Sequence, residues 1–155
     1  MAAPELHVPV PRPPGALDDL PDRVVLFDGV CVVCNRSVDW LLRRDLESRL
    51  HFAPLQGETA QRIREALPGA LPEDLDSIGY LERSGGGLRV SLRSQALRRI
   101  LEDVGGGPGL GLLRVVPVAV ADLGYRVFAR LRYRLFGRRD ACRIPSPAER
   151  TRFLP

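Results

Sequence analysis

Two cysteines, Cys31 and Cys34, are separated by two residues in the run Asp28-Gly29-Val30-Cys31-Val32-Val33-Cys34. At the start of a helix, this spacing places both sulfur atoms near one helical turn, where they can form a disulfide without a long-range rearrangement. The spacing therefore predicts a redox pair that exchanges disulfides with a partner.

The expected helix also predicts different roles for the two sulfurs. Cys31 would lie at the helix N-terminus, where unpaired N–H groups and the helix dipole lower the pKa of a thiol. We therefore expect Cys31 to be the nucleophile and the more exposed thiol. Cys34 would face the core and attack a mixed disulfide formed on Cys31. Asp28 has two open interpretations, because it could accept the proton of the second thiol or simply build the turn before the helix.

A Cys-x-x-Cys pair also occurs in zinc sites and as an inert pair of buried thiols. Zinc would need two more ligands, and the remaining candidates, Cys142, His51 and His7, form no second pair with ligand spacing. We expect no metal and no other cofactor. Cys142 itself is open to three interpretations: a buried small apolar residue, which its neighbours favour, an additional redox thiol, or a third metal ligand.

Apolar patterns predict the elements that position the cysteines. Val24–Phe27 is a short apolar run typical of a strand that is buried on both faces. A helix is expected from Val32 to about Arg44, with Cys34 on its apolar face. A second strand at Leu50–Ala53 and a helix at Glu58–Leu67 complete a strand-helix-strand-helix unit.

The next segment predicts a hairpin and a third helix. Ile78–Glu82 and Leu88–Leu92 are joined by a glycine-rich loop and should pair as antiparallel strands. Ser94 is the expected N-cap of a helix that ends at a second glycine cluster, 105–107. The order βαβαββα predicts an α/β fold, a thioredoxin-like sandwich with a C-terminal helical extension.

The two ends of the chain are predicted to differ. Residues 1–21 form a proline-rich leader outside the core, and 22–155 form one domain. Near its end, a helical pattern from about Ala119 to Phe136 carries an apolar stripe that we expect to pack on the domain. We call these residues the α-stripe: Val120, Leu123, Val127, Leu131 and Leu135.

Composition limits the cellular setting. The chain of 155 residues is 45% hydrophobic, which suits a single core, and its three cysteines are too few for a secreted disulfide framework. The N-terminus lacks the pattern of a signal peptide, and no apolar run is long enough to span a bilayer. We therefore expect a cytoplasmic protein.

Two other functions stay open. An arginine-rich surface could bind nucleic acid or another anion through Arg126, Arg130, Arg132, Arg134, Arg138, Arg139 and Arg143. Few aromatic residues accompany these arginines, so nucleic acid is the weaker expectation. The apolar helix could instead attach to a membrane surface, a contact that we do not favour.

The run Phe27–Asn35 resembles the signature of the DCC family of predicted thiol–disulfide oxidoreductases, which is named for one Asp and two Cys. Ser91–Ala96 is similar to the family's entry to its third helix, and 129–137 with 142–145 is similar to its closing segment, which also carries a cysteine. This resemblance covers about Val24 to Leu154. It implies a thioredoxin-like fold, with Asp28, Cys31 and Cys34 as signature residues.

The resemblance also implies a type of partner, either a disulfide-containing protein or a low-molecular-weight thiol, without identifying one. Thioredoxins place a cis-proline before the third strand, where its backbone helps to bind an extended partner chain. The corresponding stretch here, Asp74–Ile78, contains no proline. We therefore expect a different surface for binding a partner.

Overall fold

A four-stranded mixed sheet forms the centre of the computed structural model, which describes residues 15–155 except 76, 85–86 and 142–143. The elements follow in the order β1 (Arg23–Phe27), α1 (Val32–Arg44), β2 (His51–Pro54), α2 (Glu58–Ala66), β3 (Gly79–Ser84), β4 (Gly87–Leu92), α3 (Arg93–Asp103), α4 (Pro108–Val115), α5 (Val118–Phe136) and the 3-10 helix η1 (Arg150–Arg152). The predicted order βαβαββα is confirmed, and the fold is the expected thioredoxin-like α/β class.

The strand order in the sheet is β2-β1-β3-β4. β1 pairs in parallel with β2, with Val25 opposite Phe52, and antiparallel with β3, with Val25 opposite Tyr80. β3 and β4 form the predicted antiparallel hairpin. Since β1 lies between two strands and both its faces are covered, its apolar run is continuous rather than alternating.

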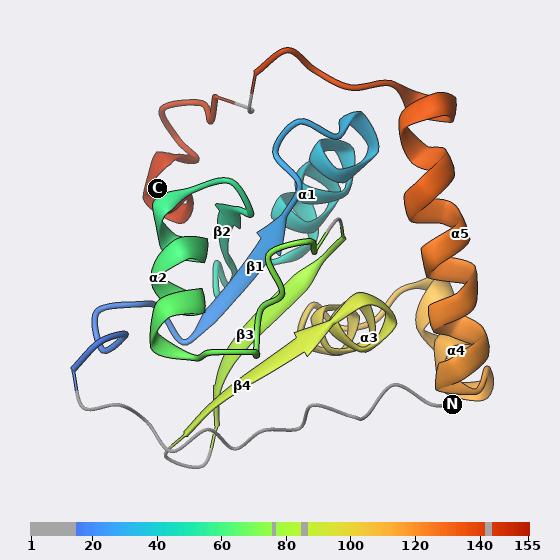
Figure 1. The fold of residues 1–155 in the computed structure, drawn as a ribbon, viewed down its shortest axis with the longest axis horizontal. Coiled ribbons are helices and arrows are strands. Elements are labelled where there is room, and N and C mark those ends of the chain that lie inside the picture. Colours follow the sequence, from blue (N-terminus) through green and yellow to red (C-terminus); the bar gives the residue numbers. More distant parts are fainter. Residues whose placement is uncertain (1–14, 76, 85–86, 142–143) are drawn as a thin grey trace.

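Helices cover both faces of this sheet (Figure 1). Side chains of a strand point alternately to opposite faces, so Val24 and Leu26 join the apolar cluster that contains α2 residues such as Ile63. Val25 and Phe27 join the other cluster, with residues of α1 and α3. The turn after β1 thus emerges between two filled cores and is held in a fixed place.

The end of the expected leader belongs to one of these cores. Residues 1–14 lie outside the described part of the chain. Leu17 and Leu20 are buried in the cluster on the α2 side, and Asp19 forms an ion pair with Arg62 of α2. The last residues of the 1–21 segment therefore pack against the domain.

The entry to α3 differs from the expectation. Helix α3 begins at Arg93 with Leu92 as its N-cap, and the apolar Leu92 side chain makes no capping hydrogen bond. The Ser94 hydroxyl instead donates a hydrogen bond to Asp122 of α5. Ser94 is thus not the N-cap, because its hydroxyl joins two helices.

Helix α4 was not expected from the sequence. Pro108 starts it, as proline often does at a first helical position, but two glycines in its eight residues weaken the helical pattern. In Figure 1, α4 and α5 stand beside α3, away from the strands.

The prediction that the α-stripe packs on the domain is wrong. Its five residues are 40 to 67% exposed. Ala129 and Arg132 are the buried residues of α5, on a different side of the helix. The small side chain of Ala129 permits close approach, and Arg132 finds a buried acidic partner, so this face meets the domain.

The chain after α5 returns across the end of the sheet to β2 (Figure 1). Arg139 N–H donates a 2.8 Å hydrogen bond to the Val30 carbonyl, and Arg138 forms an isolated β-bridge with Cys31. We call residues 137–139 the strap. Near the C-terminus, the Phe153 ring stacks on Phe52 at 5.6 Å between centroids and meets Phe27 edge-on.

Replacing Phe153 by alanine should therefore destabilise the domain. Removing a core phenylalanine costs about 3 to 5 kcal/mol, and because Phe153 is only half-buried we expect about 2 kcal/mol. Phe136→Ala is the matched control, since Phe136 is exposed on α5, and should cost less than about 1 kcal/mol. Urea unfolding measures both free energies, and equal effects would show that the C-terminal segment is not part of the core.

Candidate active site

The cysteine pair lies at the turn between β1 and α1, as predicted. Cys31 is the N-cap of α1, and its sulfur accepts the backbone N–H of Cys34 at 3.3 Å. The Cys34 thiol donates to the Cys31 sulfur, and the two Sγ atoms are 2.6 Å apart. Both are free cysteines, and a small movement would bring them to the length of a disulfide bond, about 2.05 Å.

The expected exposures of the two sulfurs are reversed. Cys31 is fully buried, whereas Cys34 is partly exposed. Cys34 shares the face of α1 that carries the buried Val38 and Leu41, but it lies in the first turn of the helix and is only partly buried. The strap pairs with the Cys31 backbone through the bridge to Arg138, and the sequence contained no signal for this contact.

Arg132 of α5 lies directly behind Cys34. It is only 1% exposed, with one terminal nitrogen 3.3 Å from Cys34 Sγ and the other 2.8 Å from Asp28 Oδ2. Burial disfavours its charge, but the two cysteines, Tyr133 and Asp28 hold the pKa of Arg132 above its usual value. A positive charge is thus fixed beside the more exposed sulfur.

The pKa of Cys34 reflects two opposing influences. Burial raises it, the hydrogen bond to Cys31 raises it further, and the charge of Arg132 lowers it. The net shift is upward, so Cys34 holds its proton at neutral pH in the reduced pair.

Asp28 accepts hydrogen bonds at both carboxylate oxygens. Arg132 and the Tyr133 hydroxyl bind Oδ2, while the Val30 N–H and the Gln56 side chain bind Oδ1 at 3.1 and 3.0 Å. Burial and the bond to Asp28 raise the pKa of Tyr133 to about 12. None of these bonds joins Asp28 to a sulfur, so Asp28 contacts the pair through Arg132. Its bond to Val30 fits the turn-building interpretation, and its proton-accepting role stays a prediction.

Neighbouring amides fix the backbone of this turn. The buried Asn35 amide donates to the carbonyls of Gly29 and Cys31, at 2.9 and 2.7 Å. The Gln56 side chain accepts the Gly29 N–H at 3.2 Å. The position of the sulfurs is thus set by contacts from the loop after β2, from α1 and from α5 together.

Sequence reasoning missed Arg132, Tyr133, Gln56 and Asn35 as parts of this site. Arg132 was counted in an exposed basic surface, and this is wrong because it is buried against Asp28. The available signal was its place in the closing segment, which is one of the segments similar to the DCC family.

The zinc alternative concerns residues that are only partly described. Cys142, Arg143 and His7 lie outside the described residues. Within the part that is described, no three His, Cys, Asp or Glu side chains come close enough to hold a metal ion. The three interpretations of Cys142 stay open.

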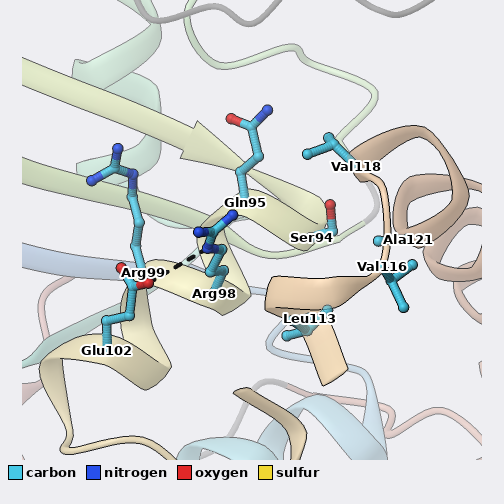
Figure 2. A pocket seen from close by; sticks show the side chains of 9 residues that line it. All are labelled: Ser94, Gln95, Arg98, Arg99, Glu102, Leu113, Val116, Val118 and Ala121. Carbon is cyan, nitrogen blue, oxygen red and sulfur yellow. Dashed lines mark hydrogen bonds and ion pairs between the residues drawn. The ribbon is translucent and has the colours of Figure 1, made fainter. Parts of the chain in front are cut away.

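Two hollows lie near the helices. An apolar pocket of about 380 Å³ opens beside Cys34, between α1, α3 and α5. A second hollow of about 230 Å³ lies between α3 and the start of α5 and contains no sulfur. Figure 2 shows that Arg98 there is paired with Glu102 within the protein. The chemistry of the cysteines therefore concerns the apolar pocket.

Comparisons with known proteins agree with this site. Residues 25–138 match the family model described as DCC1-like thiol-disulfide oxidoreductase. The chain is 36% identical over 140 residues to the uncharacterized protein YuxK of Bacillus subtilis, covering 89% of this chain and 98% of YuxK. It is 31% identical over 123 residues to a chloroplastic DCC family protein of Arabidopsis thaliana, covering 78% of this chain and 69% of that protein. No solved structure matches significantly. The family match spans most of the chain and includes Asp28, Cys31 and Cys34, so the chain belongs to the DCC1-like thiol–disulfide oxidoreductase family.

Proposed function

We propose that this protein is a thiol–disulfide oxidoreductase in which Cys34 meets the substrate and Cys31 is the resolving thiol. One observation carries the assignment. Of the two sulfurs, Cys34 borders the pocket, while Cys31 is fully buried 2.6 Å from it. These roles are the reverse of those expected from the helix N-terminus.

The reactive form of the pair holds one proton between its two sulfurs, and the first step moves this proton from Cys34 to the Cys31 sulfur along their hydrogen bond. The Cys34 thiolate, facing the Arg132 charge, attacks one sulfur of the substrate disulfide and releases the other as a thiolate. Cys31 then passes its proton to this leaving thiolate. The Cys31 thiolate, which accepts the Cys34 N–H, attacks Cys34 Sγ and releases the second substrate thiolate. That thiolate takes a proton from water.

Two electrons pass from the cysteine pair to the substrate in this sequence. The protein gains one S–S bond, and one substrate disulfide becomes two thiols. The same steps run in reverse when the partner is a dithiol, so the direction depends on relative reduction potentials. Asp28 would act as a positioning residue, because it holds Arg132 against Cys34.

A second candidate function is attachment to an anionic membrane surface through the α-stripe. The stripe is exposed, and Arg126, Arg130 and Arg134 are exposed beside it on α5. An exposed apolar helix face flanked by arginines suits the interface of a bilayer with anionic lipids. Among the described helices, none is long and apolar enough to cross a membrane.

Alkylation tests the roles of the cysteines. Limiting iodoacetamide on the reduced protein should label Cys34 before Cys31, because Cys31 is fully buried whereas Cys34 is partly exposed. Since the pKa of Cys34 is raised, its labelling rate should increase as pH rises through the alkaline range. Peptide mass spectrometry follows each site, and a mild oxidant should protect both thiols until a reductant releases them. Faster labelling of Cys31 at neutral pH would restore the opposite assignment.

Vesicle sedimentation tests the membrane contact. The protein should sediment with vesicles of phosphatidylglycerol and phosphatidylcholine, and much less with phosphatidylcholine alone or in high salt. Leu123→Glu should abolish the association. Leu46→Glu is a matched control, since Leu46 is also an exposed leucine but lies after α1, and should leave binding unchanged. Equal sedimentation of the protein with and without vesicles would exclude this function.

A further inference from the structure

The pocket beside Cys34 has the character of a site for a small apolar molecule. Aromatic side chains from β1, α1 and α5 line it: Phe27, Trp40, Tyr125 and Phe128. Its volume of about 380 Å³ is near the lower end for ligand sites, which range from roughly 300 to 1,000 Å³. It has room for a small molecule or one side chain, and Cys34 lies in its wall.

The charged groups of this pocket are few. Asp28 is engaged by Arg132 and Tyr133, and Arg36, which also lines the pocket, is exposed to solvent. A substrate with several ionised groups would lose their hydration without gaining buried partners of opposite charge. The lining thus favours an uncharged substrate.

A buried hydroxyl points to one polar contact with that substrate. Ser77 lines the pocket and is 2% exposed, and within the described part of the chain its Oγ has no hydrogen-bond partner. Buried hydroxyls usually have a partner, because leaving one unpaired is unfavourable. A ligand atom that donates or accepts a hydrogen bond would supply the missing partner.

The backbone next to the cysteines is already occupied. The strap pairs with Cys31 and with the Val30 carbonyl, which are the groups that an extended partner chain would use for strand addition at this turn. The stretch before β3, Asp74–Ile78, contains no proline, so the cis-proline with which thioredoxins bind a partner chain is absent from this stretch. These contacts favour a small substrate over a polypeptide.

We infer that the substrate is a low-molecular-weight disulfide with an uncharged aromatic substituent that carries a hydrogen-bonding atom. This inference rests on the proposed function. The substituent fills the aromatic pocket, and its S–S bond lies against Cys34. The pair reduces this disulfide, R–S–S–R, to two molecules of the thiol R–SH, and Cys31 and Cys34 become a disulfide.

A comparison of two disulfides tests the inference. Difurfuryl disulfide has an uncharged aromatic ring with an oxygen atom, whereas bis(2-hydroxyethyl) disulfide is uncharged but lacks a ring. The reduced full-length protein is mixed with each, and mass spectrometry measures the rate of Cys31–Cys34 disulfide formation. Each rate is divided by the rate at which dithiothreitol reduces the same disulfide. This division corrects for the intrinsic reactivity of each disulfide. We expect the corrected rate to be at least tenfold higher for difurfuryl disulfide.

A variant that fills the pocket provides the second comparison. Leu97→Trp, which introduces a larger ring into the lining, should reduce the preference for difurfuryl disulfide by at least fivefold. Leu112→Trp, at an exposed position of α4, should retain the preference. If Leu97→Trp does not fold, binding of the unreactive difurfuryl sulfide to the unmodified protein should change the fluorescence of Trp40, the single tryptophan of the chain.

The outcomes separate this inference from the proposed function. Reduction of both disulfides at similar corrected rates, or no response of Trp40, would overturn the substrate class and leave the oxidoreductase activity intact. Failure to reduce either disulfide would overturn both.

Discussion

The buried ion pair between Arg132 and Asp28 holds this structure and its site together. The two side chains are 1% and 3% exposed, and their atoms are 2.8 Å apart, although they lie 104 residues apart in the chain. Removing one partner of such a pair typically costs about 3 to 5 kcal/mol, because the other charge remains buried without compensation. The pair joins α5 to the turn after β1, and it places a guanidinium against Cys34.

Several features of the site follow from this placement of α5. Tyr125 and Phe128 become walls of the pocket, and the strap that follows α5 reaches Cys31. The same orientation leaves the α-stripe on the outside of the molecule. This one buried contact thus joins the helix that borders the pocket to the turn that carries the cysteines.

The sequence predicted the central fold well because local patterns encode it. The apolar run of β1, the spacing of Cys31 and Cys34 and the glycine-rich hairpin loop each constrain a short stretch of chain. The faces of α5 could not be predicted in this way, since its apolar and small residues occur on more than one side. A periodic pattern favours burying leucine and valine, whereas the helix buries Ala129 and Arg132. Such a choice depends on a partner distant in sequence, as does the bridge between Cys31 and the strap.

The structure also divides between the two cysteines two properties that were both expected of Cys31: the position at the helix N-terminus and access to a substrate. Cys31 has the N-cap position and the Cys34 N–H, whereas Cys34 has access to the pocket and contact with a cation. Because one hydrogen bond joins the two sulfurs, a proton can pass between them. In the proposed mechanism the pair therefore acts as one unit, and the charge of Arg132 lowers the pKa of the accessible thiol.

The pKa of Cys34 in Arg132 variants tests this account most directly. In a background of Cys31→Ser and Cys142→Ser, Cys34 is the only thiol, and the ultraviolet absorbance of its thiolate gives its pKa during titration. Arg132→Gln removes the charge that lowers this pKa, so the midpoint should move to higher pH by about one unit, equivalent to about 1.4 kcal/mol. Arg132→Lys should restore part of the shift, and Arg130→Gln, at an exposed position of the same helix, should leave it unchanged. If Arg132→Gln alone is unstable, the double variant with Asp28→Asn is used instead, because it removes the carboxylate that the first substitution leaves without its partner. An unchanged Cys34 pKa in a folded Arg132→Gln protein would show that the ion pair is structural only and would contradict the account.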